Sequence, residues 1–270
     1  MSEELKPQVF ANRWAGAVAP GDHERSRDEC RCLRPPRRRP RHRPTAFHRE
    51  VQDTTAPGWL RLLDLVEEAA ADGREVFAPL VELTPEQRRQ VVTLPPTIAR
   101  LTAVQHLDLY GSNLVRVPPE IGAMQSLEEF TPYRSLRLHW FPYEITRCRN
   151  LRHSTVSTRA LYGSETYRSP FPLLSAPANA AHGADPADLP PRAWGVTAIR
   201  TCSVCDRRIA GTEGLRQVWI SLWTSGRDVL PLLVNACSAA CVDALPAPAE
   251  GYVPHPHTGG LAVVQPDPED

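Results

Sequence analysis

The first sustained hydrophobic pattern in the chain covers residues 59–72, where apolar side chains recur at three- and four-residue spacing. This spacing predicts an amphipathic helix, and Gly73 suits its C-terminal cap. A shorter helix is predicted from Thr84, because Thr84 can cap it, Pro85 suits its first turn and Gln87 stands three residues after the cap. Both helices are expected to pack on a neighbouring part of the chain.

From Leu94 onward the hydrophobic pattern repeats. A short proline-containing turn ends in an isoleucine three times, and these residues, Ile98, Ile121 and Ile145, are 23 and 24 residues apart. The apolar residues that follow each isoleucine agree in their offsets. A unit of this size cannot bury its apolar face alone, so we expect the units to stack and share one core.

These units resemble a short bacterial leucine-rich repeat of the Leu-Pro-x-x-Ile subtype, a family whose period lies between about 20 and 29 residues. The resemblance covers about residues 94–157 and implies a solenoid with parallel strands, which the two predicted helices cap at its N-terminal end. The asparagine that usually follows the short strand is replaced by Ser112, Ser135 and Arg159. The ladder of buried asparagines that normally ties such units together therefore lacks its usual residue.

Strands are predicted near residues 106–110, 129–133 and 153–157. Alternate side chains of a strand point to opposite faces, so one set joins the core and the other faces outward. The outward set is His106, Asp108, Tyr110, Glu129, Thr131, Tyr133, His153 and Thr155. Parallel strands lie about 4.8 Å apart, so equivalent outward residues should form columns of touching side chains. We expect these columns to bind a protein partner. An ordinary solvated sheet face, or a metal held by His106, Glu129 and His153, are the alternatives.

Two close cysteine pairs, Cys202 with Cys205 and Cys237 with Cys241, lie further along the chain. A two-residue gap lets both sulfurs of a tight turn point to one place, and a three-residue gap puts two on one face of a helix. Four thiolates placed in this way can hold Zn²⁺ tetrahedrally, and a site filled by four protein ligands is structural. Four buried thiols without a metal remain the alternative. A redox pair is disfavoured, because no βαβ pattern surrounds the cysteines.

The chain between the two cysteine pairs contains two β-rich runs, 217–223 and 228–234, separated by a turn at 224–227. This pattern predicts a hairpin. A cysteine turn, a hairpin and a helix that starts at the second pair resemble a treble-clef zinc finger over about residues 201–245.

The predicted fold class is therefore α/β: a short leucine-rich repeat solenoid with parallel strands and an N-terminal helical cap, then a small α+β zinc-finger-like module. Six arginines between Arg34 and Arg43 alternate with prolines, which predicts a disordered tail. The expected organisation is a tail at 1–57, the repeat domain at 58–165, a linker at 166–195, the zinc module at 196–250 and a second disordered tail at 251–270.

Composition narrows the function classes. The 270-residue chain has no formal net charge, which argues against a general polyanion binder. It has no apolar run of about 18 residues, no secretory signal, and an odd count of seven cysteines, so we expect a cytoplasmic protein that does not enter a membrane. No catalytic motif is present, and we expect a non-enzymatic scaffold or adaptor. The alternative is a nucleic-acid-binding protein that uses the arginine-rich tail and the zinc module.

Overall fold

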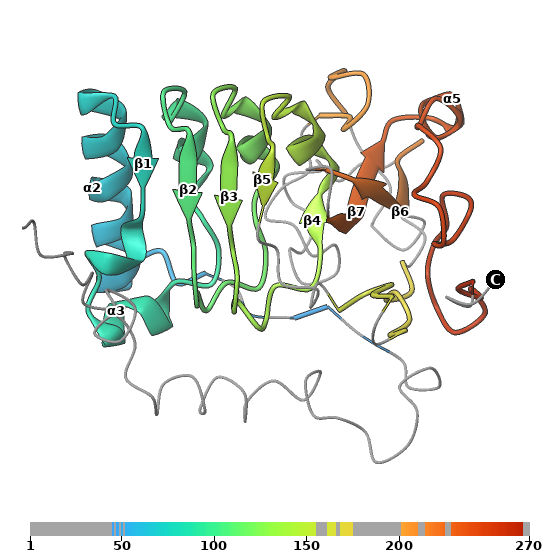
Figure 1. Cartoon of the computed structure of the whole chain (residues 1–270), viewed down its shortest axis with the longest axis horizontal. Coiled ribbons are helices and arrows are strands. Elements are labelled where there is room, and N and C mark those ends of the chain that lie inside the picture. Colours follow the sequence, from blue (N-terminus) through green and yellow to red (C-terminus); the bar gives the residue numbers. More distant parts are fainter. Residues whose placement is uncertain are drawn as a thin grey trace, which may run out of the picture.

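The computed structural model is a mixed α/β structure with two small sheets (Figure 1). Within the described residues, no helix is long and apolar enough to cross a membrane. The description covers residues 45, 47, 48, 50, 52–154, 161–165, 168–174, 201–209, 214–224 and 228–266. The predicted linker falls largely outside these ranges, as do residues 1–44.

The two predicted N-terminal helices are present. Helix α2 spans Pro57–Asp72 and ends at Gly73, whose positive φ of 65° suits a left-handed cap. Helix α3 spans Pro85–Gln90, and Thr84 and Gln87 form the expected reciprocal capping box. The first turn of α2 lies so close to α3 that a side chain at Gly58 would meet the backbone of Gln87. The helices therefore pack together at one end of the molecule.

The repeated pattern builds three similar units. Each contains a 3-10 turn that holds the isoleucine, and these are η4 (Pro96–Arg100), η5 (Pro119–Ala123) and η6 (Tyr143–Arg147). Short parallel strands follow them at β2 (His106–Asp108), β3 (Glu129–Thr131) and β5 (His153–Ser154). The predicted parallel pairing is confirmed, and the strands start at the predicted residues, with β2 and β3 shorter than predicted.

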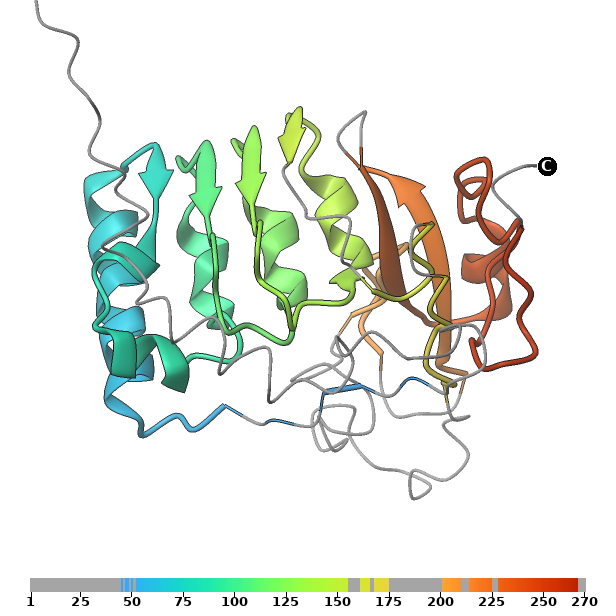
Figure 2. The same cartoon turned by 60° about the horizontal axis from the view of Figure 1, so that its bottom comes forward.

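A fourth strand, β1 (Val76–Phe77), extends this sheet at its N-terminal edge, so that the order is β1-β2-β3-β5. Sequence periodicity does not show β1, because two residues are too few for an alternating pattern. The strands line one side of the array and the 3-10 turns the other (Figure 2).

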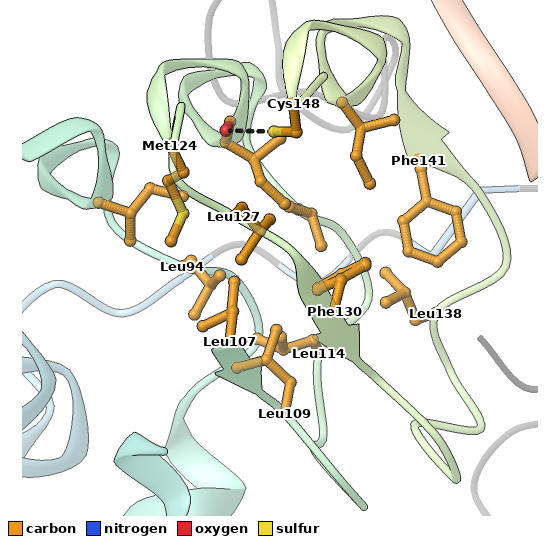
Figure 3. Close-up of a cluster of buried hydrophobic side chains, with 14 of the residues drawn as sticks. Leu94, Leu107, Leu109, Leu114, Met124, Leu127, Phe130, Leu138, Phe141 and Cys148 are labelled. Atoms are coloured by element: carbon orange, nitrogen blue, oxygen red, sulfur yellow. Dashed lines mark hydrogen bonds between the residues drawn. The ribbon is translucent and has the colours of Figure 1, made fainter. Parts of the chain in front are cut away.

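Apolar side chains from successive units meet between the strands and the 3-10 turns (Figure 3). Phe130 contacts Phe141 edge-on, with ring centroids 5.9 Å apart. The thiol of Cys148 donates to the carbonyl of Ile121 in the preceding unit over 3.3 Å. One continuous buried cluster extends from α2 through the three units to the C-terminal hairpin.

Two buried serines take the place of the missing asparagines. The hydroxyl of Ser135 donates to the carbonyl of Leu109 over 2.9 Å and accepts the backbone N–H of Ser112 over 3.1 Å. The two hydroxyl oxygens are 2.7 Å apart. Buried backbone groups must find a partner, so these serines provide the cross-unit hydrogen bonds that asparagine would otherwise supply.

The predicted hairpin is also present. Strands β6 (Arg216–Trp223) and β7 (Val229–Ala236) pair antiparallel over eight residues each. Strand β7 pairs parallel with β4 (Phe141–Pro142) on its other side, so the second sheet joins the hairpin to the third unit. The hairpin thereby covers the open end of the stacked units (Figures 1 and 2). The predicted boundary between the repeat domain and the zinc module stays a prediction, but the core is continuous across it.

Part of the predicted N-terminal tail is packed. We call Thr45, Phe47, His48, Glu50 and Gln52 the N-terminal strap. Its Phe47 lies in the aromatic cluster around the hairpin, and its Glu50 pairs with Arg137 in the loop after β3. Its Gln52 donates to the carbonyl of Gln90 and accepts from the N–H of Val92, each over 2.9 Å. The prediction of a disordered tail is therefore wrong for these residues. They lack periodicity because each makes a separate long-range contact.

The predicted C-terminal tail is likewise packed in its described part, residues 251–266. Val253 and His257 are buried, and the backbones of Trp219 and His257 exchange two hydrogen bonds of 2.7 and 3.1 Å. The prediction of disorder is wrong here as well. The reason is that this proline-rich segment pairs with β6 without forming a regular element of its own.

We expect Phe47→Ala to lower the free energy of unfolding by about 2 kcal/mol, because Phe47 stacks on Trp219 and meets Trp140 edge-on. Leu60→Ala, on the exposed side of α2, is the control and should cost less than ~1 kcal/mol. Chemical denaturation followed by tryptophan fluorescence measures both. Equal stabilities for Phe47→Ala and the unsubstituted chain would show that the strap does not dock.

We also expect His257 to make the protein sensitive to acid. Burial, and then the charge of His255, lower the pKa of His257 from 6.5 to about 4. The neutral ring also accepts the N–H of Gly259 at Nδ1 over 3.1 Å. The unfolded chain therefore takes up this proton first as the pH falls, and stability is lost between about pH 6.5 and 4, by up to about 3 kcal/mol.

Urea unfolding at a series of pH values tests this assignment. His257→Asn keeps an acceptor in place and should remove that part of the acid-dependent loss, whereas His255→Asn, at an exposed position, should retain most of it. The assignment fails if the His257→Asn variant loses as much stability as the unsubstituted chain over this pH range.

Candidate metal centre

The first cysteine pair lies in a tight turn. The carbonyl of Cys202 accepts the N–H of Asp206 over 3.1 Å, and the N–H of Cys202 donates to the carbonyl of Arg207 over 2.8 Å. Asp206 has a φ of 59°, in the left-handed region that lets the chain reverse. This turn places the side chains of Cys202 and Cys205 on the same side, as the two-residue gap predicts.

The second pair lies where β7 passes into a short helix, α5 (Ala239–Asp243). Ser238 caps this helix and accepts the N–H of Cys241 over 3.3 Å. Cys241 is inside the helix, whereas Cys237 comes before its cap. The predicted helical spacing of the two cysteines is therefore only partly right, because the helix starts after Cys237, but both thiols still reach one point.

The four sulfur atoms form one compact group. All lie within 4.8 Å of one another, and the Sγ of Cys237 is 3.6 Å from those of Cys205 and Cys241. A disulfide needs about 2.05 Å, so these are free thiols. A tetrahedral ion with metal–sulfur bonds of about 2.3 Å separates its ligands by about 3.8 Å, close to the observed spacing. The donor set therefore fits a thiophilic metal ion.

Within the quartet, the thiol of Cys237 holds its proton strongly. The hydrogen bond to Cys241, followed by desolvation, raises the pKa of Cys237 to about 12. A cation at the centre reverses this preference, because it stabilises thiolates and displaces the protons. The spacing of the four sulfurs thus suits a metal ion, and the raised pKa of Cys237 makes this residue a weak nucleophile in the absence of a metal.

Strand β7 positions the cysteine turn through residues that the sequence patterns did not identify. The N–H of Ser203 donates to the carbonyl of Asn235 over 2.8 Å, and the N–H of Asn235 donates to the hydroxyl of Ser203 over 2.9 Å. Gln217 of β6 donates to the side chain of Asn235 over 2.6 Å. These contacts join residues that are 32 and 18 positions apart in sequence, so local spacing carries no signal of them.

The third unit also contacts the cysteine turn. Arg147 of η6 donates to the carbonyl of Ser203 over 2.9 Å and pairs with Asp206 at 2.5 Å. Glu144 is buried, and this burial raises its pKa, while a hydrogen bond with Ser203 opposes the rise. The candidate metal centre is therefore held to the array as well as to the hairpin.

The predicted columns of outward-facing residues are found on the sheet, where Glu129 pairs with His106 on one side and with His153 on the other. Asp108 pairs with Thr131, and Thr155 lies outside the described residues. We call the outward side of β1, β2, β3 and β5 the strand face.

The alternative metal site at His106, Glu129 and His153 is not found. Nε2 of His106 contacts Thr131 at 3.1 Å and Glu129 at 3.7 Å. Within the described part of the chain, however, the group whose ligand atoms meet metal spacing is the cysteine quartet. The strand pairing places the backbones of His106, Glu129 and His153 side by side. The ring of His153, however, does not come within metal-ligand spacing of the side chains of His106 and Glu129.

Tyr110 and Tyr133, the last predicted pair of outward residues, contact each other with ring centroids 5.8 Å apart and an interplanar angle of 38°. The loops after β2 and β3 keep the strand register, since Gly111 donates to the carbonyl of Tyr133 over 2.8 Å. The alignment of equivalent residues thus continues past the ends of β2 and β3.

No family model and no curated protein match the chain. Three chains of solved structure match, among them the leucine-rich repeat domain of the type III effector XopL. The identity to that chain is 19% and the TM-score is 0.30, over 54% of this chain. The match spans 39% of the XopL chain. The interpretation of the fold therefore depends on the register and packing described above.

We expect one metal ion per chain, bound through the cysteine quartet. Cys241→Ser should reduce the metal content of the purified chain from one equivalent towards zero, because a hydroxyl is a poor ligand for a soft metal. Cys148→Ser is the matched control, since Cys148 is buried between units and lies outside the quartet.

Elemental analysis of protein purified without chelator measures the content, with zinc as the expected element. The control should keep its metal and lose only packing energy. A metal content that Cys241→Ser leaves unchanged, or a chain that purifies without metal, would contradict the assignment.

Proposed function

We propose that this chain is a non-enzymatic protein-interaction protein of the scaffold or adaptor kind, and that it acts in the cytoplasm. Its stacked units are leucine-rich repeats of the Leu-Pro-x-x-Ile subtype, arranged as a short solenoid. The strand face binds a protein partner, and the cysteine quartet holds a structural zinc ion in a treble-clef-like module.

The parallel register of the strand face carries the proposal. It aligns polar and aromatic side chains from successive strands into columns, notably His106 with Glu129 and Tyr110 with Tyr133. Rigid tyrosines beside polar groups are typical of surfaces that recognise proteins. Stacked units generally offer such an extended face to a partner.

The zinc assignment is supported by the number and type of ligands. Four cysteine thiolates satisfy a tetrahedral Zn²⁺ completely, whereas a catalytic zinc keeps a position open for water or substrate. The quartet would therefore supply folding energy and no chemistry. The hairpin it closes packs on the third unit, so zinc would stabilise the end of the array as well.

The nucleic-acid alternative depends on the arginines at 34–43, which lie outside the described residues. Near the quartet, Asp206 already pairs with Arg147, and basic and acidic residues are interspersed. The described contacts thus favour the protein partner.

Selection of phage-displayed random peptides on the immobilised full chain tests the proposal. We expect peptides whose binding falls about tenfold with Tyr133→Ala or Glu129→Ala, because exposed aromatic and charged residues at a contact typically carry its energy. Glu86→Ala, on the exposed side of α3, is the control and should leave binding unchanged. The proposal fails if no peptide is enriched, or if the selected peptides bind the strand-face variants and the unsubstituted chain equally well.

A further inference from the structure

A carboxylate on the strand face is more buried than its position suggests. Asp108 lies at the end of β2 on the outward side, yet only 9% of it is exposed. Its Oδ1 accepts the N–H of Tyr110 over 2.9 Å, and Oδ2 has no hydrogen bond with any described residue. Desolvation raises the pKa of Asp108, and the hydrogen bond from Tyr110 offsets only part of this effect. A buried carboxylate with a single hydrogen bond favours the approach of a cationic donor.

An aromatic pair lies beside this carboxylate. Tyr110 follows Asp108 by two positions, and two residues of extended chain cover about 7 Å. Tyr133 contacts Tyr110 and is 45% exposed, so its ring is available to a partner. A cation held over such a ring within about 6 Å of its centre is attracted by the π electrons. An extended basic side chain could therefore contact the rings and Asp108 together.

The remaining charge on the strand face has the same sign. Glu129 is exposed over nearly half of its side chain, and its Oε1 lies 3.7 Å from Nε2 of His106. No lysine or arginine occupies an outward position on the described strands β1, β2, β3 and β5. Arg134 follows Tyr133 directly but lies beyond the strand, where the chain turns with a φ of 62°. The face is thus complementary to a positively charged segment.

We propose that the strand face recognises an arginine side chain on a partner peptide, with Asp108 as the ion-pair acceptor and Tyr110 and Tyr133 as the stacking platform. Arginine suits this arrangement better than lysine, because its planar guanidinium can stack on a ring and donate to a carboxylate at once. Glu129 adds attraction at the rim. This inference rests on the proposed function, since it names the chemistry of the partner for the same face.

Fluorescence anisotropy with a short labelled peptide that carries a central run of arginines tests this chemistry on the full chain. The matched probe replaces each arginine by citrulline, which keeps the shape and removes the charge. We expect the citrulline peptide to bind at least about tenfold more weakly. A lysine peptide should bind with intermediate affinity.

Substitutions locate the site. Asp108→Asn keeps an acceptor for the N–H of Tyr110 but removes the charge, and Tyr133→Leu removes an exposed ring, so both variants should fold. Each should weaken arginine-peptide binding about tenfold. Glu86→Gln on α3 removes one exposed charge elsewhere and should have no effect. Equal affinity for the arginine and citrulline peptides would overturn the proposal, as would equal losses for Glu86→Gln and Asp108→Asn.

The chain's own arginines at 34–43 could compete with the probe, so the titration is repeated on a full chain in which they are replaced by glutamine. One outcome is that the probe binds only to this glutamine variant, and that Asp108→Asn in the same background abolishes the binding. This result would support the same chemistry, with an arginine of the chain itself as the ligand of the strand face.

The phage selection separates this proposal from the broader one. Selected peptides that bind the strand face without a basic residue, and that Asp108→Asn does not affect, would overturn the arginine assignment and leave the protein-interaction function standing. A selection that enriches no peptide, together with an arginine probe that does not bind, would overturn both proposals.

Discussion

Stacked units cannot cover their own ends, and this constraint organises the whole molecule. Each unit buries its apolar side chains only where a neighbour lies on both sides, so the first and last units need a different cover. Helix α2 provides it at the N-terminal end, and the β6–β7 hairpin provides it at the C-terminal end through the pairing of β7 with β4. The core is consequently continuous from the first helix to the last hairpin.

The C-terminal cover needs support of its own, because a two-stranded hairpin is marginal in water. The cysteine quartet joins the chain before β6 to the chain after β7, and Arg147 links the same turn back to the array. Phe47 of the N-terminal strap packs against the hairpin from another direction. The cover is thus attached by the cysteine quartet, by hydrogen bonds to η6 and by an aromatic cluster.

The register of the strands fixes both the core and the outward side of the sheet. The same pairing that places Leu107 and Phe130 in the core aligns His106 with Glu129 and Asp108 with Thr131 on the strand face. The serine pair at Ser112 and Ser135 holds this register beyond the strands. The columns on the strand face are therefore a by-product of core packing, and their chemistry varies with residues that the core does not constrain.

Local sequence determined much of this structure. The spacing of apolar residues predicted α2, the capping residues predicted α3, the 23- and 24-residue period predicted the parallel strands, and the cysteine gaps predicted the quartet. Each of these features repeats or ends within a few residues, so its physical cause is visible in a short stretch of chain.

Only the tertiary structure decided how the ends are covered. The pairing of β4 with β7, the strap at Phe47 and the packing of His257 against β6 join residues far apart in sequence. Proline-rich segments of this kind have no periodicity, and composition alone predicts disorder for them. Their order arises because an uncovered apolar end offers them surface to bury, and that surface exists only once the units have stacked.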